Sequence, residues 1–185
     1  AMPFYLGMAA TADPLVAVAL GPKWLEAAPV VHWLALAMPM MTLQVLYAPA
    51  SDACGRPGIS AQNSATGALC LPIAFLIGVH WGLMGLVAAW FAAYPVYLAV
   101  STWRTLPVIG VKPGALVEAI APPVLAAVAM ALLVTGLDTL LPPLPALPHL
   151  ALLVGAGGVI YGGLLFLFAR PVLIESINLI RNRHG

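Results

Sequence analysis

The residues that could carry out chemistry are few in this chain, and they lie far apart. The six acidic residues occur singly along the sequence, and the four histidines fall on different segments. Proton transfer and nucleophilic catalysis need such groups within hydrogen-bonding reach of one another. Glu26 and His32 come nearest to this, but six residues is a poor spacing for contact along a helix. The sequence therefore predicts no catalytic residues, and we expect a protein that is not an enzyme.

The two cysteines give no sign of a metal or redox site. Cys54 and Cys70 are too few for a disulfide framework, and no spacing of cysteine and histidine is typical of zinc binding. We expect both thiols to be inert packing residues, and we expect neither a metal nor a cofactor. The net charge of +1 is too small to bind a run of phosphates, which argues against nucleic acid as a partner.

Polar side chains recur at helical spacing in three segments that are otherwise mostly apolar. Residues that follow one another at intervals of three or four lie on one face of a helix. The polar residues of the three segments are Gln44, Tyr47 and Ser51; Gln62, Asn63 and Thr66; and Tyr94, Tyr97, Ser101 and Arg104. The three faces are expected at a similar depth, so they can meet.

Such a meeting of polar faces predicts a water-filled cavity in the membrane. Its candidate lining is Gln44, Tyr47, Gln62, Asn63, Tyr94 and Tyr97, with Arg56 and Arg104 at the mouth. Guanidinium groups match phosphate oxygens with paired donors, so the cavity could receive an anionic head group. The alternative is that these polar side chains form hydrogen bonds between helices at the membrane interface, while the arginines face lipid phosphates. The sequence leaves both interpretations open.

The segments that hold these residues must lie in a membrane. The chain is 63% hydrophobic and 7% charged, whereas soluble domains are about 25% charged. A soluble fold of 185 residues could not bury so much apolar surface. No charged residue occurs between Ala27 and Ser51, a stretch longer than the roughly 20 residues that cross a bilayer as a helix. The predicted fold class is all-α, a polytopic transmembrane helix bundle.

Six spans are expected, in a single bundle that takes up residues 1–185. The first should break near Asp13, because Pro14 disfavours helix in the residue before it. The tail fits a short helix in the membrane interface, or a frayed end. The expected spans are residues 1–20, 24–50, 59–79, 82–103, 114–137 and 150–169, and the interfacial helix is 171–183.

Prolines and glycines interrupt the expected spans. Prolines lie inside four of them, at Pro39, Pro72, Pro95 and 122–123. Interrupted helices are common in transporters, but proline is also simply frequent in membrane helices. Two pairs of glycines allow close helix approach by their spacing of four residues. These pairs are Gly78 with Gly82 and Gly158 with Gly162.

The charged residues set the orientation of the spans. If the connections alternate between two sides, one side holds six cations and the other holds only Lys23. Cytoplasmic loops carry the excess of lysine and arginine, so the first span runs outward and the C-terminus is cytoplasmic. The six cations are Arg56, Arg104, Lys112, Arg170, Arg181 and Arg183.

Three motifs give the chain a family resemblance. The run 13–28 (DPLVAVALGPKWLEAA), then Cys54-Gly55-Arg56, and then the run 82–89 (GLMGLVAA) occur in this order. In these motifs the chain resembles the oligosaccharide and polysaccharide flippases of bacterial inner membranes, within the multidrug/oligosaccharidyl-lipid/polysaccharide exporter superfamily. The branch it resembles most is that of the lipopolysaccharide, O-antigen and exopolysaccharide exporters. The resemblance covers residues 3–110, and the last two spans match mainly in hydropathy.

The resemblance implies a fold and a function. The chain would be the C-terminal lobe of a two-lobed, alternating-access transporter, with the N-terminal lobe missing. It would move an undecaprenyl-diphosphate-linked oligosaccharide across the inner membrane. This sequence has no cation deep in any span, so a central cationic site would have to come from the absent lobe. The alternatives are a multidrug exporter of the same superfamily, which would need an acidic residue deep in the bundle, and a membrane assembly subunit without transport activity.

Overall fold

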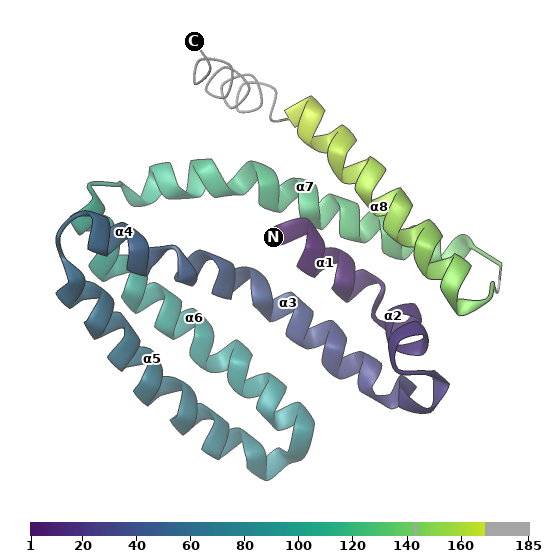
Figure 1. Cartoon of the computed structure of the whole chain (residues 1–185), viewed down its shortest axis with the longest axis horizontal. Coiled ribbons are helices and arrows are strands. Elements are labelled where there is room, and N and C mark those ends of the chain that lie inside the picture. The colour runs from purple at the N-terminus through teal and green to yellow at the C-terminus, as the bar shows by residue number, and fades with distance from the viewer. Residues whose placement is uncertain (143, 169–185) are drawn as a thin grey trace.

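The computed structural model describes residues 1–142 and 144–168, and this part of the chain is helical without a β-strand. The α-helices are joined by short turns, two of which are 3-10 helices (Figure 1). In chain order the elements are α1 (Met2–Ala10), α2 (Ala12–Ala19), η1 (Pro22–Ala27), α3 (Ala28–Val45), α4 (Tyr47–Ala53), α5 (Pro57–Gly78), η2 (Val79–Trp81), α6 (Gly82–Ile109), α7 (Pro113–Leu140) and α8 (Ala146–Phe168).

The protein is an all-helical, polytopic membrane bundle. Four helical stretches are long and apolar enough to cross a membrane, or up to five if the bent pair α1 and α2 counts as one span. One of the four, Pro57–Ile109, doubles back at η2, so that α5 and α6 lie side by side (Figure 1). Each expected span therefore has a helical counterpart when α5 and α6 are counted separately. The expected interfacial helix 171–183 lies outside the described residues.

Two spans break shortly before a proline. The first bends by 83° between α1 and α2, at Thr11, and α3 gives way to α4 at Leu46. Pro14 and Pro49 each follow three residues later, in the first turn of the new helix, where a missing N–H costs nothing. The first break falls two residues before the expected Asp13, because the proline starts a helix here.

The prolines deeper within the helices do not break them. Helices α3, α5, α6 and α7 continue past their internal prolines at Pro39, Pro72, Pro95, Pro107 and 122–123. A membrane helix tolerates the lost hydrogen bond where neighbouring groups or small local adjustments satisfy the freed carbonyl. The interior prolines therefore do not mark interrupted spans in this structure.

The helices are arranged in one curved row. In the order α5, α6, α3, α1, α7, α8, each helix lies beside the next, with α5 and α8 at opposite edges (Figure 1). Lipid tails are as apolar as leucine side chains, so the hydrophobic effect does not drive membrane helices together. They associate instead through close van der Waals contact. More than half of the buried apolar residues are alanines, which bring helix backbones close. A cluster of buried side chains, Met130, Val134 and Leu153, joins α7 to α8.

Glycines form the turns at both ends of the second span. Gly21 has φ of 93° and Gly55 has φ of 70°, a region that is strained for residues with a side chain. These glycines let the chain reverse direction next to Lys23 and Arg56. The motif Cys54-Gly55-Arg56 is therefore a turn sequence, and the run 13–28 contains a turn at Gly21 between α2 and η1.

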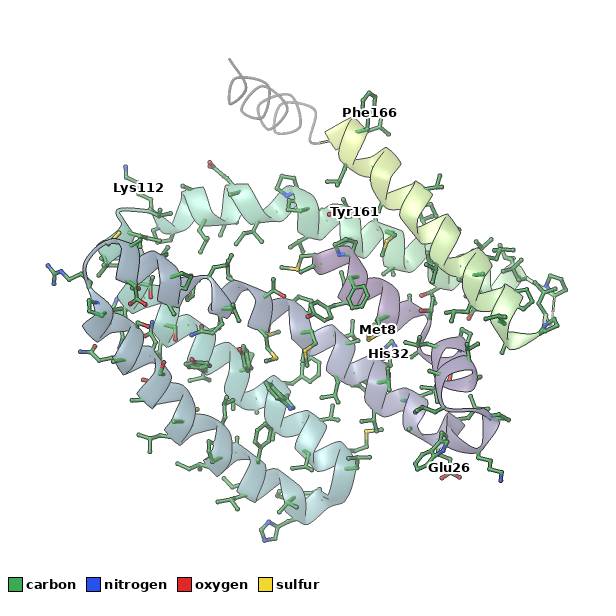
Figure 2. All side chains as sticks on the ribbon, in the orientation of Figure 1. Met8, Glu26, His32, Lys112, Tyr161 and Phe166 are labelled. Carbon is green, nitrogen blue, oxygen red and sulfur yellow. The ribbon has the colours of Figure 1, made fainter. Side chains whose placement is uncertain are left out.

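Many of the helix ends lie in two regions, whereas the turn between α5 and α6 lies apart from both at the bottom of Figure 1. Helix α4, the start of α5, the end of α6 and the start of α7 lie together at the left of Figure 1, whereas α2, η1 and the end of α7 lie at the right. Figure 2 shows Lys112 and Glu26 at these opposite ends. Arg56 and Arg104 belong to the elements at the Lys112 end, and Lys23 belongs to η1. Arg170, Arg181 and Arg183 lie outside the described residues.

Candidate functional site

Side-chain hydrogen bonds tie α6 to its two neighbours. The Nε2 of Gln44 on α3 donates to the Oγ of Ser101 on α6 over 3.1 Å. On the other side, the Nδ2 of Asn63 on α5 donates to the Oγ1 of Thr105 over 3.0 Å. Ser101 and Thr105 are fully buried and one helical turn apart, so α6 holds α3 and α5 at the same depth.

A fourth element, α4, joins the same network. The hydroxyl of Tyr47 and the Oγ1 of Thr102 share a hydrogen bond of 2.7 Å. The hydroxyl of Ser51 donates to the main-chain oxygen of Tyr47 over 2.8 Å. Thr102 follows Ser101 directly, so adjacent residues of α6 bind the two sides of the break at Leu46. The network therefore fixes the angle between α3 and α4.

A cavity of about 320 Å³ lies beside this network, between α3, α4, α5 and α6. Its volume is at the lower end of the range of small-molecule sites, about 300–1,000 Å³. The exposed residues Val45, Ala48 and Ser64 stand at its edge. Its lining residues are Met41, Gln44, Val45, Tyr47, Ala48, Ser60, Asn63, Ser64, Leu71, Trp90, Tyr94 and Tyr97. We call this space the α3–α6 cavity.

One wall of the α3–α6 cavity is aromatic. The rings of Trp90 and Tyr94 lie 5.3 Å apart at 32°, and those of Tyr94 and Tyr97 lie 5.6 Å apart at 83°. The three residues follow at intervals of four and three along α6, which places them on one face. Gly67 on α5 leaves room for this wall, because a Cβ there would lie 2.8 Å from the Cζ of Tyr97.

Two buried amide oxygens in this cavity have no hydrogen-bond partner. They are the Oε1 of Gln44 and the Oδ1 of Asn63, on side chains that are 9% and 4% exposed. An unpaired amide oxygen away from water costs about 1–3 kcal/mol. No charged residue lines the cavity. The cavity is therefore neutral, and two of its lining side chains, Gln44 and Asn63, each keep an unpaired amide oxygen that is buried beside it.

The two candidate arginines lie outside the cavity. Arg104 turns toward α5, where its guanidinium donates to the Oγ1 of Thr66 over 2.7 Å and to the main-chain oxygen of Gln62 over 3.4 Å. Arg56 is exposed at the start of α5, about two to three helical turns from Arg104's contacts. The side chain of Gln62 is also exposed. These three residues are at the same end of the bundle as the cavity but do not line it.

Five of the eight residues proposed from the sequence line one cavity, namely Gln44, Tyr47, Asn63, Tyr94 and Tyr97. The sequence reasoning missed Trp90, Met41 and Leu71, although Trp90 precedes Tyr94 by one turn. It also missed Thr102 and Thr105 as hydrogen-bond partners. Interhelical hydrogen bonds and a cavity occur side by side in the structure.

Two larger hollows in the described part of the chain are almost wholly apolar. One of about 390 Å³ lies between α1, α2, α7 and α8, where Met8 and Tyr161 are labelled in Figure 2. Another of about 510 Å³ lies beside the turn between α5 and α6. They offer few groups that would orient a ligand. A ligand site needs a small number of placed polar groups, so the smaller α3–α6 cavity is the better candidate.

The described residues contain no arrangement typical of catalysis. No group of three or more His, Cys, Asp or Glu residues could hold a metal ion there. The carboxylate of Asp138 lies 2.8 Å from the Nε2 of His149, off hydrogen-bond geometry, and links the end of α7 to the start of α8. His32 does not meet Glu26, which is exposed in η1 (Figure 2). Its Nδ1 instead lies 2.8 Å from the main-chain oxygen of Ala9.

The arrangement can hold a small polar molecule between membrane helices, close to the end that carries Arg56, Arg104 and Lys112. Comparisons with protein-family models, with curated proteins and with solved structures found no match.

Proposed function

We propose that this chain belongs to a transporter that exports a lipid-linked oligosaccharide or polysaccharide precursor across a bacterial inner membrane. The observation that carries the proposal is the α3–α6 cavity, in which Gln44 and Asn63 keep buried, unpartnered oxygens between membrane helices. Polar groups inside the membrane are costly and are usually functional. A transport site needs such groups, whereas a bundle that only packs in lipid gains nothing from leaving them unpaired.

The substrate would be divided between protein and lipid. The head group would occupy the polar cavity, and the polyprenyl tail would stay among the apolar faces that the helices expose to the bilayer. The α3–α6 cavity opens beside exposed apolar residues such as Val45, which is 67% exposed. A lipid-linked molecule could therefore enter sideways, with its head group in the cavity and its tail still in lipid.

The diphosphate would need cations that the cavity does not supply. We place Arg56 and Arg104 at the cytoplasmic end, where they would meet the substrate as it enters. Arg104 already makes a hydrogen bond to Thr66, so part of its guanidinium is occupied. The main cationic site would then come from an N-terminal lobe of the same protein, as the sequence resemblance implies. In this arrangement the C-terminus is cytoplasmic.

Substitution of the arginines tests the proposed function. We expect Arg104→Ala to lower export of lipid-linked glycan by about tenfold, because a charge-assisted hydrogen bond is worth about 1.5–3 kcal/mol. Arg56→Ala should have a smaller effect in the same direction, since Arg56 is exposed. The measurement is the amount of glycan that reaches the outer leaflet in cells that depend on the protein. Arg104→Lys keeps the charge and should restore part of the activity.

The matched control for these substitutions is Lys23→Ala. Lys23 is exposed at the opposite end of the bundle, so its loss should leave export unchanged. Full export in both arginine variants at normal protein levels would overturn the role of the cations. Normal glycan export in cells that lack the protein would overturn the function itself and would favour a membrane assembly subunit.

One observation favours a second candidate, the export of lipophilic cations. Glu118 lines an otherwise apolar cavity of about 540 Å³ between α7 and α8. A carboxylate beside an apolar wall suits a cationic drug. Efflux of a lipophilic cationic dye, measured in the same strains, separates the two functions. Loss of dye efflux with normal glycan export would identify a multidrug exporter.

A further inference from the structure

We infer that the α3–α6 cavity binds an uncharged, hydroxyl-bearing ring of the substrate, such as a sugar residue, and not its phosphate groups. The inference rests on the proposed function for the class of substrate, and it assigns one part of that substrate to one site. One of the two interpretations of the sequence placed an anionic head group in this cavity, with Arg56 and Arg104 at its mouth. The geometry of the cavity points to a different ligand chemistry.

The buried amides require a ligand that brings hydrogen-bond donors. Gln44 and Asn63 already use one end of each amide on Ser101 and Thr105. Their oxygens remain free, although the two side chains are at least nine-tenths buried. If the side-chain amide rotated by 180°, its NH₂ group would take the place of its unpaired oxygen. A hydroxyl group can bind to either end of an amide, because it both donates and accepts.

A phosphate does not suit this site. It carries acceptor oxygens and negative charge, which would face two amide oxygens in a cavity without a cationic side chain. Bringing an unpaired anion into such surroundings costs more than the contacts return. The nearest arginine, Arg104, is directed toward Thr66 on α5. The anionic part of a substrate would therefore remain outside the cavity.

The aromatic wall suits the apolar face of a sugar ring. Trp90, Tyr94 and Tyr97 line the cavity. The faces of aromatic rings carry partial negative charge, and a sugar ring has a face of C–H groups with partial positive charge. These aromatic faces could also attract an organic cation. The cavity lacks a carboxylate to neutralise such a cation, and the free amides would have no role in holding an alkylated one. With about 320 Å³, the cavity suits a single ring and not a chain of several.

The test is a binding measurement with three probes on the protein in lipid nanodiscs. Trp90 lines the cavity, so its fluorescence reports occupancy once the other four tryptophans are replaced by phenylalanine. The probes are methyl β-glucoside, inorganic diphosphate and tetramethylammonium. We expect saturable quenching by the glucoside and none by the two ions. Thermal unfolding of each variant checks that the fold is kept.

Substitutions of the amides locate the binding site. Gln44→Leu and Asn63→Leu should each raise the dissociation constant for the glucoside by about tenfold, the effect of one lost hydrogen bond to a buried acceptor. Gln62→Leu is the matched control, since Gln62 precedes Asn63 but its side chain is exposed outside the cavity. If an amide variant fails to fold, Tyr94→Phe keeps the ring and removes only a hydroxyl. It should weaken binding by about threefold.

Each outcome decides between the proposals. Stronger quenching by diphosphate or tetramethylammonium, sensitive to Gln44→Leu, would overturn the choice of a neutral ligand. Absence of quenching by all three probes would overturn the site. In both cases export that still depends on Arg104 would leave the proposed function standing. Glucoside binding in a protein whose loss does not affect glycan export would instead overturn the proposed function and keep the sugar site.

Discussion

His32 satisfies a main-chain group that the break between α1 and α2 leaves free. In a continuous helix the carbonyl of Ala9 would accept from the N–H of residue 13. The chain bends by 83° at Thr11, and the Nδ1 of His32 lies 2.8 Å from that carbonyl instead. Inside a membrane, no water is present to donate a hydrogen bond to an unsatisfied carbonyl. His32 therefore binds α3 to the break in α1 and α2.

Removal of this imidazole should destabilise the protein. We expect His32→Ala to lower the free energy of unfolding by about 1 kcal/mol, the typical cost of one lost hydrogen bond. His80→Ala is the matched control, because the Nδ1 of His80 is exposed and contacts only carbonyls of its own turn. That variant should stay within about 0.5 kcal/mol of the parent. Unfolding in mixed micelles measures both, and equal losses would contradict the role of His32.

Spacing along the sequence identified part of the candidate site, because a helix converts spacing into a shared face. Gln44 with Tyr47, and Tyr94 with Tyr97, lie on the cavity side as expected. The contact between His32 and Ala9 joins residues 23 positions apart, and no local pattern encodes it. The direction of Arg104 was also beyond prediction, because its partner, Thr66, lies on another helix. Side-chain partners between helices depend on how the helices rotate against each other.

Two glycines determine how closely helices α5 and α6 approach each other. A Cβ on Gly85 would collide with the main-chain oxygen of Gly78, and one on Gly78 would collide with the main chain of Gly85. The sequence motif predicted close helix approach at Gly78 and Gly82. The prediction was wrong for Gly82, because nothing lies within 4 Å of a Cβ at that position. Gly82 forms the turn after η2, with φ of 69°, and Gly85 takes its place in the crossing. The crossing matters for the site, since α5 and α6 supply two walls of the α3–α6 cavity.

A methyl group at this crossing should therefore separate α5 from α6. We expect Gly85→Ala to destabilise the fold by about 1–3 kcal/mol, the usual cost of overpacking, because the obstructing atom belongs to the main chain and cannot swing away. The matched control is Gly155→Ala on α8, where nothing in the described structure lies within 4 Å of the added Cβ. That change should be neutral or slightly stabilising, since alanine favours helix. Thermal unfolding compares the two, and a harmless Gly85→Ala would refute the close crossing.

The second glycine pair, Gly158 and Gly162, does not form a close helix crossing within the described residues. Gly158 and Gly162 have the spacing that permits close helix approach, yet neither has an atom near its would-be Cβ within the described residues. Composition and hydropathy were enough to predict helices and their approximate ends, because membrane helices must satisfy their own main chain. Which helices pack together depends on the shapes of the helix surfaces that face each other. A spacing of four residues between glycines permits a close contact but does not require one.

At the scale of the whole molecule, the helices cover one another only in part. Between 11% and 22% of each of the four membrane-crossing windows is buried within the structure. The buried residues of α7 are confined to one stretch from its middle onward, at Ala126, Ala127, Met130 and Val134. The remaining faces are apolar and suit lipid or further protein.

The charges at the two ends of this row predict its orientation, and a native thiol can test it. Cys54 is exposed next to Gly55 and Arg56, at the end that the positive-inside rule assigns to the cytoplasm. We expect a membrane-impermeant maleimide to label Cys54 only after the membrane is opened. Cys70 is half-buried within α5, where a water-soluble reagent does not reach.

In a Cys54→Ser background, Lys23→Cys should react in intact spheroplasts, because Lys23 is exposed at the opposite end. Labelling of Cys54 in intact spheroplasts would reverse the orientation and with it the cytoplasmic entrance beside Arg56 and Arg104. Equal labelling of both positions would contradict the two-ended arrangement of charges.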